Sequence, residues 1–71
     1  NFPKVLKLTV IDNKQMKEID EYTFANFSQL KLLDVSRNNL ETIYSNSFYG
    51  LNNLIELTMS RNRIKTITKR L

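Results

Sequence analysis

The sequence predicts an α/β fold of the solenoid type, in which about three stacked repeats form a parallel β-sheet on the concave face and loops and short helical turns on the convex side. Three observations lead to this prediction. A pattern of apolar residues recurs after 24 residues. Each copy is too short to bury its own apolar residues, so it needs neighbouring copies. In the second and third copies, a strand-like segment runs into an asparagine and returns soon afterwards to apolar residues.

The repeat is clearest in its second and third copies. A step of 24 pairs the residues Leu30, Leu33, Val35, Asn38, Leu40 and Ile43 with Leu54, Leu57, Met59, Asn62, Ile64 and Ile67. A first copy lies upstream, but its strand-like part, residues 5–13, matches only at a step of 25. We therefore place one extra residue in the turn after the first strand, where an insertion is easiest to accommodate. The prediction is a single domain over residues 1–71, cut from a longer solenoid, with repeats at about 5–29, 30–53 and 54–71.

The asparagines explain how a strand can run into a sharp turn inside a stacked fold. Such a turn leaves backbone groups away from water, and a side-chain amide has two donors and an acceptor that satisfy them. We predict that Asn38 and Asn62 form a ladder, in which each bonds the backbone of its own and of the adjacent repeat. Asn39 should face solvent instead. Because the first repeat is one residue longer, the place of Asn13 in the ladder stays open.

This pattern resembles the leucine-rich repeat, whose signature is L-x-x-L-x-L-x-x-N-x-L. The unit LKLLDVSRNNLETIYSNSFYGLNN is similar to the 24-residue subclass with a phenylalanine near its end, as in Toll-like receptors and secreted insect immune proteins. The resemblance implies a protein-recognition module of an extracellular receptor or a secreted recognition factor, in innate immunity. An intracellular scaffold and a cell-adhesion protein stay open as alternatives, because a chain without cysteine also suits a reducing compartment.

The predicted binding surface follows from the alternation of side chains across a strand, which points one set inward and the other outward. The outward set forms the concave face, the usual binding surface of a solenoid. Within it, Ile11 and Leu32 are either a small apolar contact for a protein partner or isolated surface residues. Arg37 and Arg61 share a register, either as a basic column for an acidic or phosphate-bearing ligand or as a solvated edge. The predicted partner-binding residues are Lys7, Thr9, Ile11, Leu32, Asp34, Ser36, Arg37, Glu56, Thr58, Ser60 and Arg61.

Two features are predicted for the convex side. Phe24 and Phe48 share a register and should stack in an aromatic stripe of the core rather than hold a cofactor. The triplet NFS at residues 26–28 is an N-glycosylation sequon. It either places sugar on Asn26 in a secreted protein or occurs by chance in a chain that is rich in asparagine.

Composition argues against several other classes of protein. The chain has no cysteine and no histidine, and its cluster of Glu18, Asp20 and Glu21 is expected to be a solvated patch, so we predict no enzyme, no metal site and no cofactor. The net charge of +4 is modest, and without a groove-reading helix we expect no specific nucleic-acid partner. No apolar run is long enough to span a membrane. Both ends of the stack are uncovered, so the chain alone is expected either to be poorly stable or to self-associate through its ends.

Overall fold

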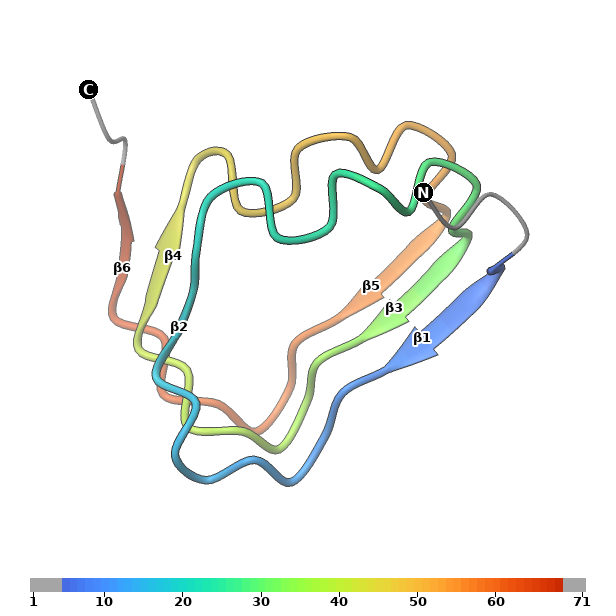
Figure 1. The fold of residues 1–71 in the computed structure, drawn as a ribbon. Coiled ribbons are helices and arrows are strands. Elements are labelled where there is room, and N and C mark those ends of the chain that lie inside the picture. Colours follow the sequence, from blue (N-terminus) through green and yellow to red (C-terminus); the bar gives the residue numbers. More distant parts are fainter. Residues whose placement is uncertain (1–4, 69–71) are drawn as a thin grey trace.

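The structure is a computed structural model that describes residues 5–68, and it contains two parallel sheets of three strands each (Figure 1). The first sheet has the order β1-β3-β5 and consists of β1 (Lys7–Thr9), β3 (Leu32–Asp34) and β5 (Glu56–Thr58). The second sheet has the order β2-β4-β6 and consists of β2 (Glu18–Ile19), β4 (Thr42–Tyr44) and β6 (Thr66–Thr68). Each coil of the chain supplies one strand to each sheet, which confirms the predicted solenoid.

The register of the strands locates the extra residue of the first coil. Between β1 and β3, Leu8 pairs with Leu33, which is a step of 25, whereas Leu33 pairs with Leu57 at a step of 24. In the second sheet, Ile19 pairs with Ile43 at a step of 24. The insertion therefore lies between β1 and β2. A backbone hydrogen bond from Met16 to Asn13 closes a turn there, so the extra residue is absorbed in that turn.

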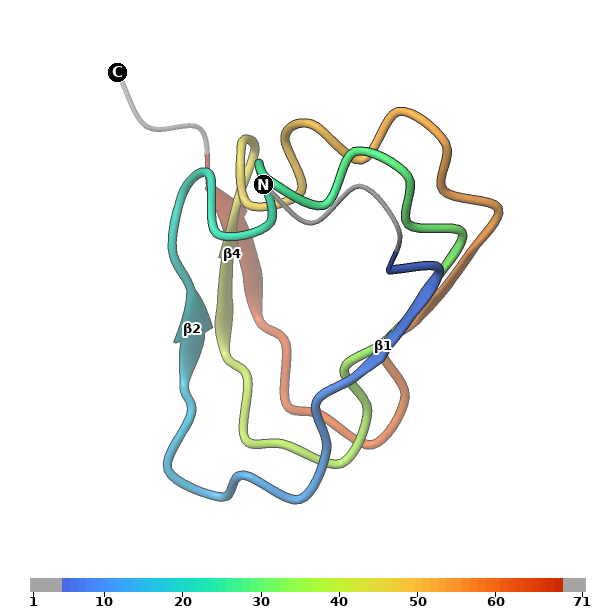
Figure 2. The same cartoon turned by 45° about the vertical axis from the view of Figure 1, so that its right-hand side comes forward.

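The core lies between the two sheets and is centred on the middle coil (Figure 2). Leu33 and Val35 enter it from the first sheet side, and Ile43 enters it from the second. Their equivalents Leu57 and Met59 in the third coil are only half-buried. The middle coil is covered by a neighbour on each side, and full burial of such a side chain stabilises the fold by about 1.5–3 kcal/mol. The buried apolar residues are Ile19, Phe24, Leu30, Leu33, Val35, Leu40 and Ile43.

The convex side contains turns and the second sheet. The sequence did not predict this sheet. Residues 5–68 contain no helix. Single turns are closed by backbone hydrogen bonds such as those from Phe27 to Phe24 and from Leu51 to Phe48. At the end of one turn Gly50 has a φ of 93°, and a Cβ there would lie 3.1 Å from the Cα of Ala25 in the preceding coil. Glycine at this position lets the two coils pack closely.

A buried serine joins the second sheet to these turns. Ser47 is fully buried; its hydroxyl donates to the carbonyl of Ile19 and accepts from the backbone N–H of Tyr44 at 3.0 Å. It therefore links the first coil to the second on the convex side. One repeat earlier, the hydroxyl of Thr23 donates to the carbonyl of Asp20 at 2.7 Å. Thr23 is exposed and this bond stays within its own coil, so a hydroxyl residue at this register does not by itself indicate the buried link that Ser47 forms.

Candidate functional site

The outward side chains of the first sheet form two rows across the stack. The register aligns Lys7, Leu32 and Glu56 in one row, and Thr9, Asp34 and Thr58 in the next. The side chains between them, from Leu8, Leu33 and Leu57, belong to the core or pack against it. The edge residues Lys7, Thr9 and Glu56 are exposed, whereas the central Leu32 and Asp34 are half-buried. We call these two rows the concave face.

The sequence also predicts a third outward row of Ile11, Ser36 and Ser60, and this row continues the concave face only in part. Ile11 is half-buried and Ser60 is exposed. Ser36 is only 7 % exposed, which corrects its assignment as a contact residue. Its hydroxyl donates to the carboxylate of Asp34 at 2.6 Å, and this bond keeps the small side chain against the protein. The usable surface therefore ends at Asp34 in the middle coil.

Asp34 carries a fixed negative charge at the centre of the concave face. The hydroxyl and the backbone N–H of Ser36 both donate to its carboxylate, and these bonds hold the pKa of Asp34 below its ordinary value. Burial opposes these two bonds with a smaller effect that raises the pKa of Asp34, and the positive charges of Arg37 and Lys7 each lower it by less still. Asp34 is consequently ionised at neutral pH, in the middle of a face that also presents Lys7 and Glu56.

The strands of the concave face end in turns that require an unusual backbone conformation. Asp12, Arg37 and Arg61 have φ values of 60°, 55° and 56°, in the left-handed region that costs a residue with a Cβ of the order of 1 kcal/mol. Backbone hydrogen bonds from Asp12 to Arg37 and from Arg37 to Ser60 tie successive turns together. An asparagine follows the left-handed residue in each turn.

The side-chain amides of Asn38 and Asn62 satisfy the backbone of these turns. Asn38 donates to the carbonyls of Val35 at 2.7 Å and Val10 at 2.9 Å, and its oxygen accepts from the backbone N–H of Asn13 at 2.8 Å. Asn62 donates to Met59 and Val35, and accepts from the backbone of Asn38 and Leu40. Each amide thus bonds its own coil and the preceding one. The side chain of Asn13 donates only to Ile11 within its own turn.

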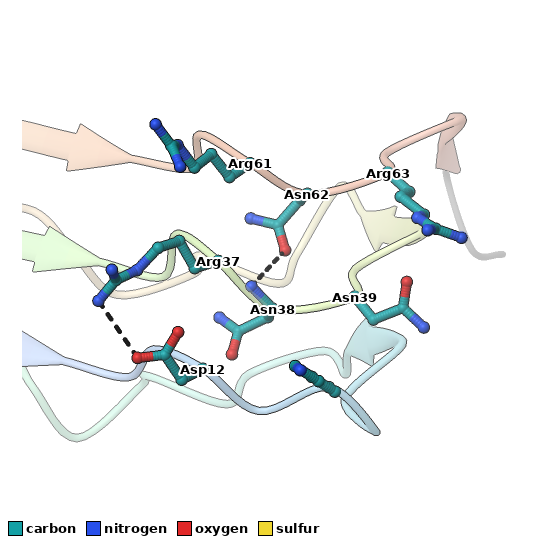
Figure 3. Close-up of a pocket in the computed structure, with 8 residues that line it drawn as sticks. Asp12, Arg37, Asn38, Asn39, Arg61, Asn62 and Arg63 are labelled. Atoms are coloured by element: carbon teal, nitrogen blue, oxygen red, sulfur yellow. Dashed lines mark hydrogen bonds and ion pairs between the residues drawn. The ribbon is translucent and has the colours of Figure 1, made fainter.

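These turns also line a cavity of about 710 Å³ (Figure 3). At the cavity, the guanidinium of Arg37 donates a hydrogen bond to the carboxylate of Asp12 at 3.2 Å. Two basic lining residues, Lys14 and Arg63, were not among the predicted binding residues. Asn39, expected in solvent, is half-buried and lines the same cavity. The sequence does contain a pattern that indicates this cluster, because Lys14, Asn39 and Arg63 each directly follow the asparagine of their turn and so share one register. The lining residues are Asp12, Lys14, Arg37, Asn38, Asn39, Arg61, Asn62 and Arg63.

On the convex side, the rings of Phe24 and Phe48 lie parallel, with an interplanar angle of 1° and centroids 6.1 Å apart. Phe24 is buried and Phe48 is half-buried, so this stack belongs to the core. Asn26 is exposed in the turn that follows Phe24, and Ser28, the third residue of the sequon, is half-buried. The carbonyl of Ser28 accepts a hydrogen bond from Asn53 at 2.8 Å.

Comparison with known proteins identifies the family. Residues 3–64, most of the chain, match the family model described as leucine rich repeat. Comparison with curated proteins and with solved structures gave no significant match. Among residues 5–68 there is no helix that could cross a membrane and no group of three potential metal ligands. The chain belongs to the leucine-rich repeat family, a class of non-catalytic modules that recognise other proteins.

Proposed function

We propose that the concave face binds its protein partner directly, as part of an extracellular receptor or a secreted recognition factor. The observation that carries the proposal is the row in which the apolar Leu32 lies between the charged residues Lys7 and Glu56. An apolar centre with a polar rim is the usual anatomy of a protein interface. Because β1, β3 and β5 pair in one sheet, their side chains are already in place before binding, and this lowers the entropic cost of association.

The extracellular setting is supported by the sequence resemblance and by Asn26. The sequon asparagine is exposed in the segment that connects β2 to β3, outside the strands that form the concave face. A role in innate immunity rests on the resemblance to the 24-residue repeats of Toll-like receptors. An intracellular scaffold is the second candidate, because a chain without cysteine also suits a reducing compartment. A cell-adhesion protein is a further alternative within the same family.

Affinity capture with the chain as bait tests the binding surface. Thr9→Lys changes the concave face, and Asn52→Lys changes a convex turn as the matched control. Both sites are exposed, neither side chain forms a hydrogen bond within residues 5–68, and each variant gains one positive charge. A partner that is lost with Thr9→Lys and retained with Asn52→Lys supports the proposal. A partner retained by both variants, or lost with both, contradicts it.

Expression in a secretory host tests the location. We expect the chain to gain a glycan that is absent from the Asn26→Gln variant, as measured by intact mass and by enzymatic deglycosylation. Fractionation of the natural source supplies the decisive comparison. Recovery of the protein in the cytosol, without a glycan, would support the intracellular alternative instead.

A further inference from the structure

A second charged surface lies beside the concave face, where the strands of the first sheet end in the asparagine turns. We call it the basic turn edge and define it by Lys14, Arg37, Arg61 and Arg63, which surround the cavity described above. Arg37 and Arg61 directly follow the outward positions of the second and third coils. In Figure 3 both side chains extend towards the strands of the first sheet, whereas Arg63 lies on the other side of the ladder.

The charge of this edge is only partly compensated. Four cations line the cavity together with the single carboxylate of Asp12, which leaves a net charge of +3 (four minus one). Asp12 pairs with Arg37, and within the described part of the chain Lys14, Arg61 and Arg63 form no ion pair. The net positive charge of this lining favours the binding of an anionic ligand there.

The edge is also held in place by the fold. Arg37 and Arg61 each precede a ladder asparagine, and that asparagine fixes the turn by hydrogen bonds to two coils. Adjacent strands lie about 4.8 Å apart, so the two arginines arise from points separated by about one strand spacing. Asn39, which forms no hydrogen bond through its side chain within residues 5–68, adds a neutral donor to the same cavity.

We propose that the basic turn edge binds an acidic, extended segment of the protein partner. This rests on the proposed function, in that the ligand is a peptide that continues from the concave face. The planar fork of an arginine matches a carboxylate with two hydrogen bonds. In an extended peptide, alternate side chains on one face are about 6.6 Å apart, within reach of two arginines on neighbouring coils. Within residues 5–68 the cavity lining contains no aromatic side chain, so this part of the chain lacks the stacking platform that single-stranded nucleic acid uses.

Fluorescence anisotropy with a labelled hexa-glutamate peptide tests this proposal, with hexa-glutamine as the uncharged probe. The variant is Arg61→Gln with Arg63→Gln, and its matched control is Lys31→Gln with Lys65→Gln, which removes the same charge from exposed sites outside the cavity. We expect the arginine variant to bind hexa-glutamate roughly tenfold more weakly, equivalent to about 1.4 kcal/mol, and the control less than twofold. Equal weakening in both pairs would overturn the proposal, because net charge alone would then account for binding.

Three further binding measurements test whether the result is specific to these arginines. Arg61→Lys with Arg63→Lys retains the charge, and we expect it to bind more weakly than the natural chain; circular dichroism checks that each variant is folded. An oligothymidylate of equal charge is the competing probe, and tighter binding of this probe with the same dependence on the arginines would overturn the acidic-peptide assignment. Leu32→Ala should leave hexa-glutamate binding unchanged, so loss of binding at the concave face and loss at the basic turn edge are distinguishable.

Discussion

The side chains of Asn38 and Asn62 stabilise turns that the backbone could not satisfy by itself. Each follows a residue in the left-handed conformation, and each donates to carbonyls of two coils. Asn39, the next residue, lines a cavity and forms no such bond within the described residues. Two adjacent asparagines with the same chemistry therefore have different structural roles.

We expect Asn38→Ala to lower the free energy of unfolding by about 1–3 kcal/mol, because it leaves the N–H of Asn13 and the carbonyl of Val10 without the Asn38 amide that they bond. Asn39→Ala should change it by less than about 0.5 kcal/mol. Urea denaturation of dilute protein measures both values. Equal losses in the two variants would show that the ladder does not hold the turns.

Asp34 predicts a dependence of stability on pH. Its pKa in the folded protein lies below the ordinary value of 3.8, so the ionised carboxylate stabilises the fold above that pH. This contribution is lost as the pH falls through the lowered pKa. We expect the difference in urea midpoint between the natural chain and Asp34→Asn to be constant from pH 5 to 7 and to shrink below about pH 4. A difference that does not vary with pH would assign the effect of Asp34 to something other than its charge.

The strands show which parts of the structure follow from the sequence. The first sheet was predictable because three copies of a period-two pattern lie in one register, as Leu8, Leu33 and Leu57 illustrate. The second sheet was not, because each of its strands supplies a single isoleucine, Ile19, Ile43 or Ile67, and one apolar residue cannot distinguish a strand from a turn. The burial of Ser36 and Ser47 was also unpredictable from pattern, since each depends on a hydrogen-bond partner supplied by tertiary structure.

Ser47 tests the role of the second sheet. We expect Ser47→Ala to destabilise the fold by about 1–3 kcal/mol, because the buried carbonyl of Ile19 and the N–H of Tyr44 lose their hydrogen-bond partner. Ser45→Ala, at an exposed site two residues earlier, is the matched control and should have little effect. Thermal denaturation followed by circular dichroism measures both. If the two variants melt together, the serine does not link the coils.

Across the whole molecule, burial is uneven, since the middle coil is covered on both sides and the third coil on one. Ile55 and Ile67 are 76 % and 73 % exposed, and β5 and β6 pair on one side only within residues 5–68. Apolar surface next to an open strand edge favours pairing with another chain. We therefore expect the predicted self-association to occur at this edge.

For the 71-residue chain alone, we expect light scattering to show species larger than a monomer that increase with concentration. Ile67→Lys should shift this equilibrium towards the monomer by replacing an exposed apolar side chain of the edge strand β6 with a charge. Thr66→Lys, which adds the same charge to β6 but removes no apolar side chain, is the control and should shift it less. A dilute monomer with a sharp thermal transition, unchanged by Ile67→Lys, would be inconsistent with association through this edge.

The central claim is that a leucine-rich repeat stack presents its concave face to a protein partner, and site-specific photo-crosslinking tests it most directly. The photoreactive residue p-benzoylphenylalanine replaces Leu32 in the concave face or, as the control, Tyr49, which is 59 % exposed on a convex turn. We predict a covalent adduct with a single protein partner from position 32 and none from position 49. An adduct from position 49 alone would contradict the account, because the partner would then lie on the convex side.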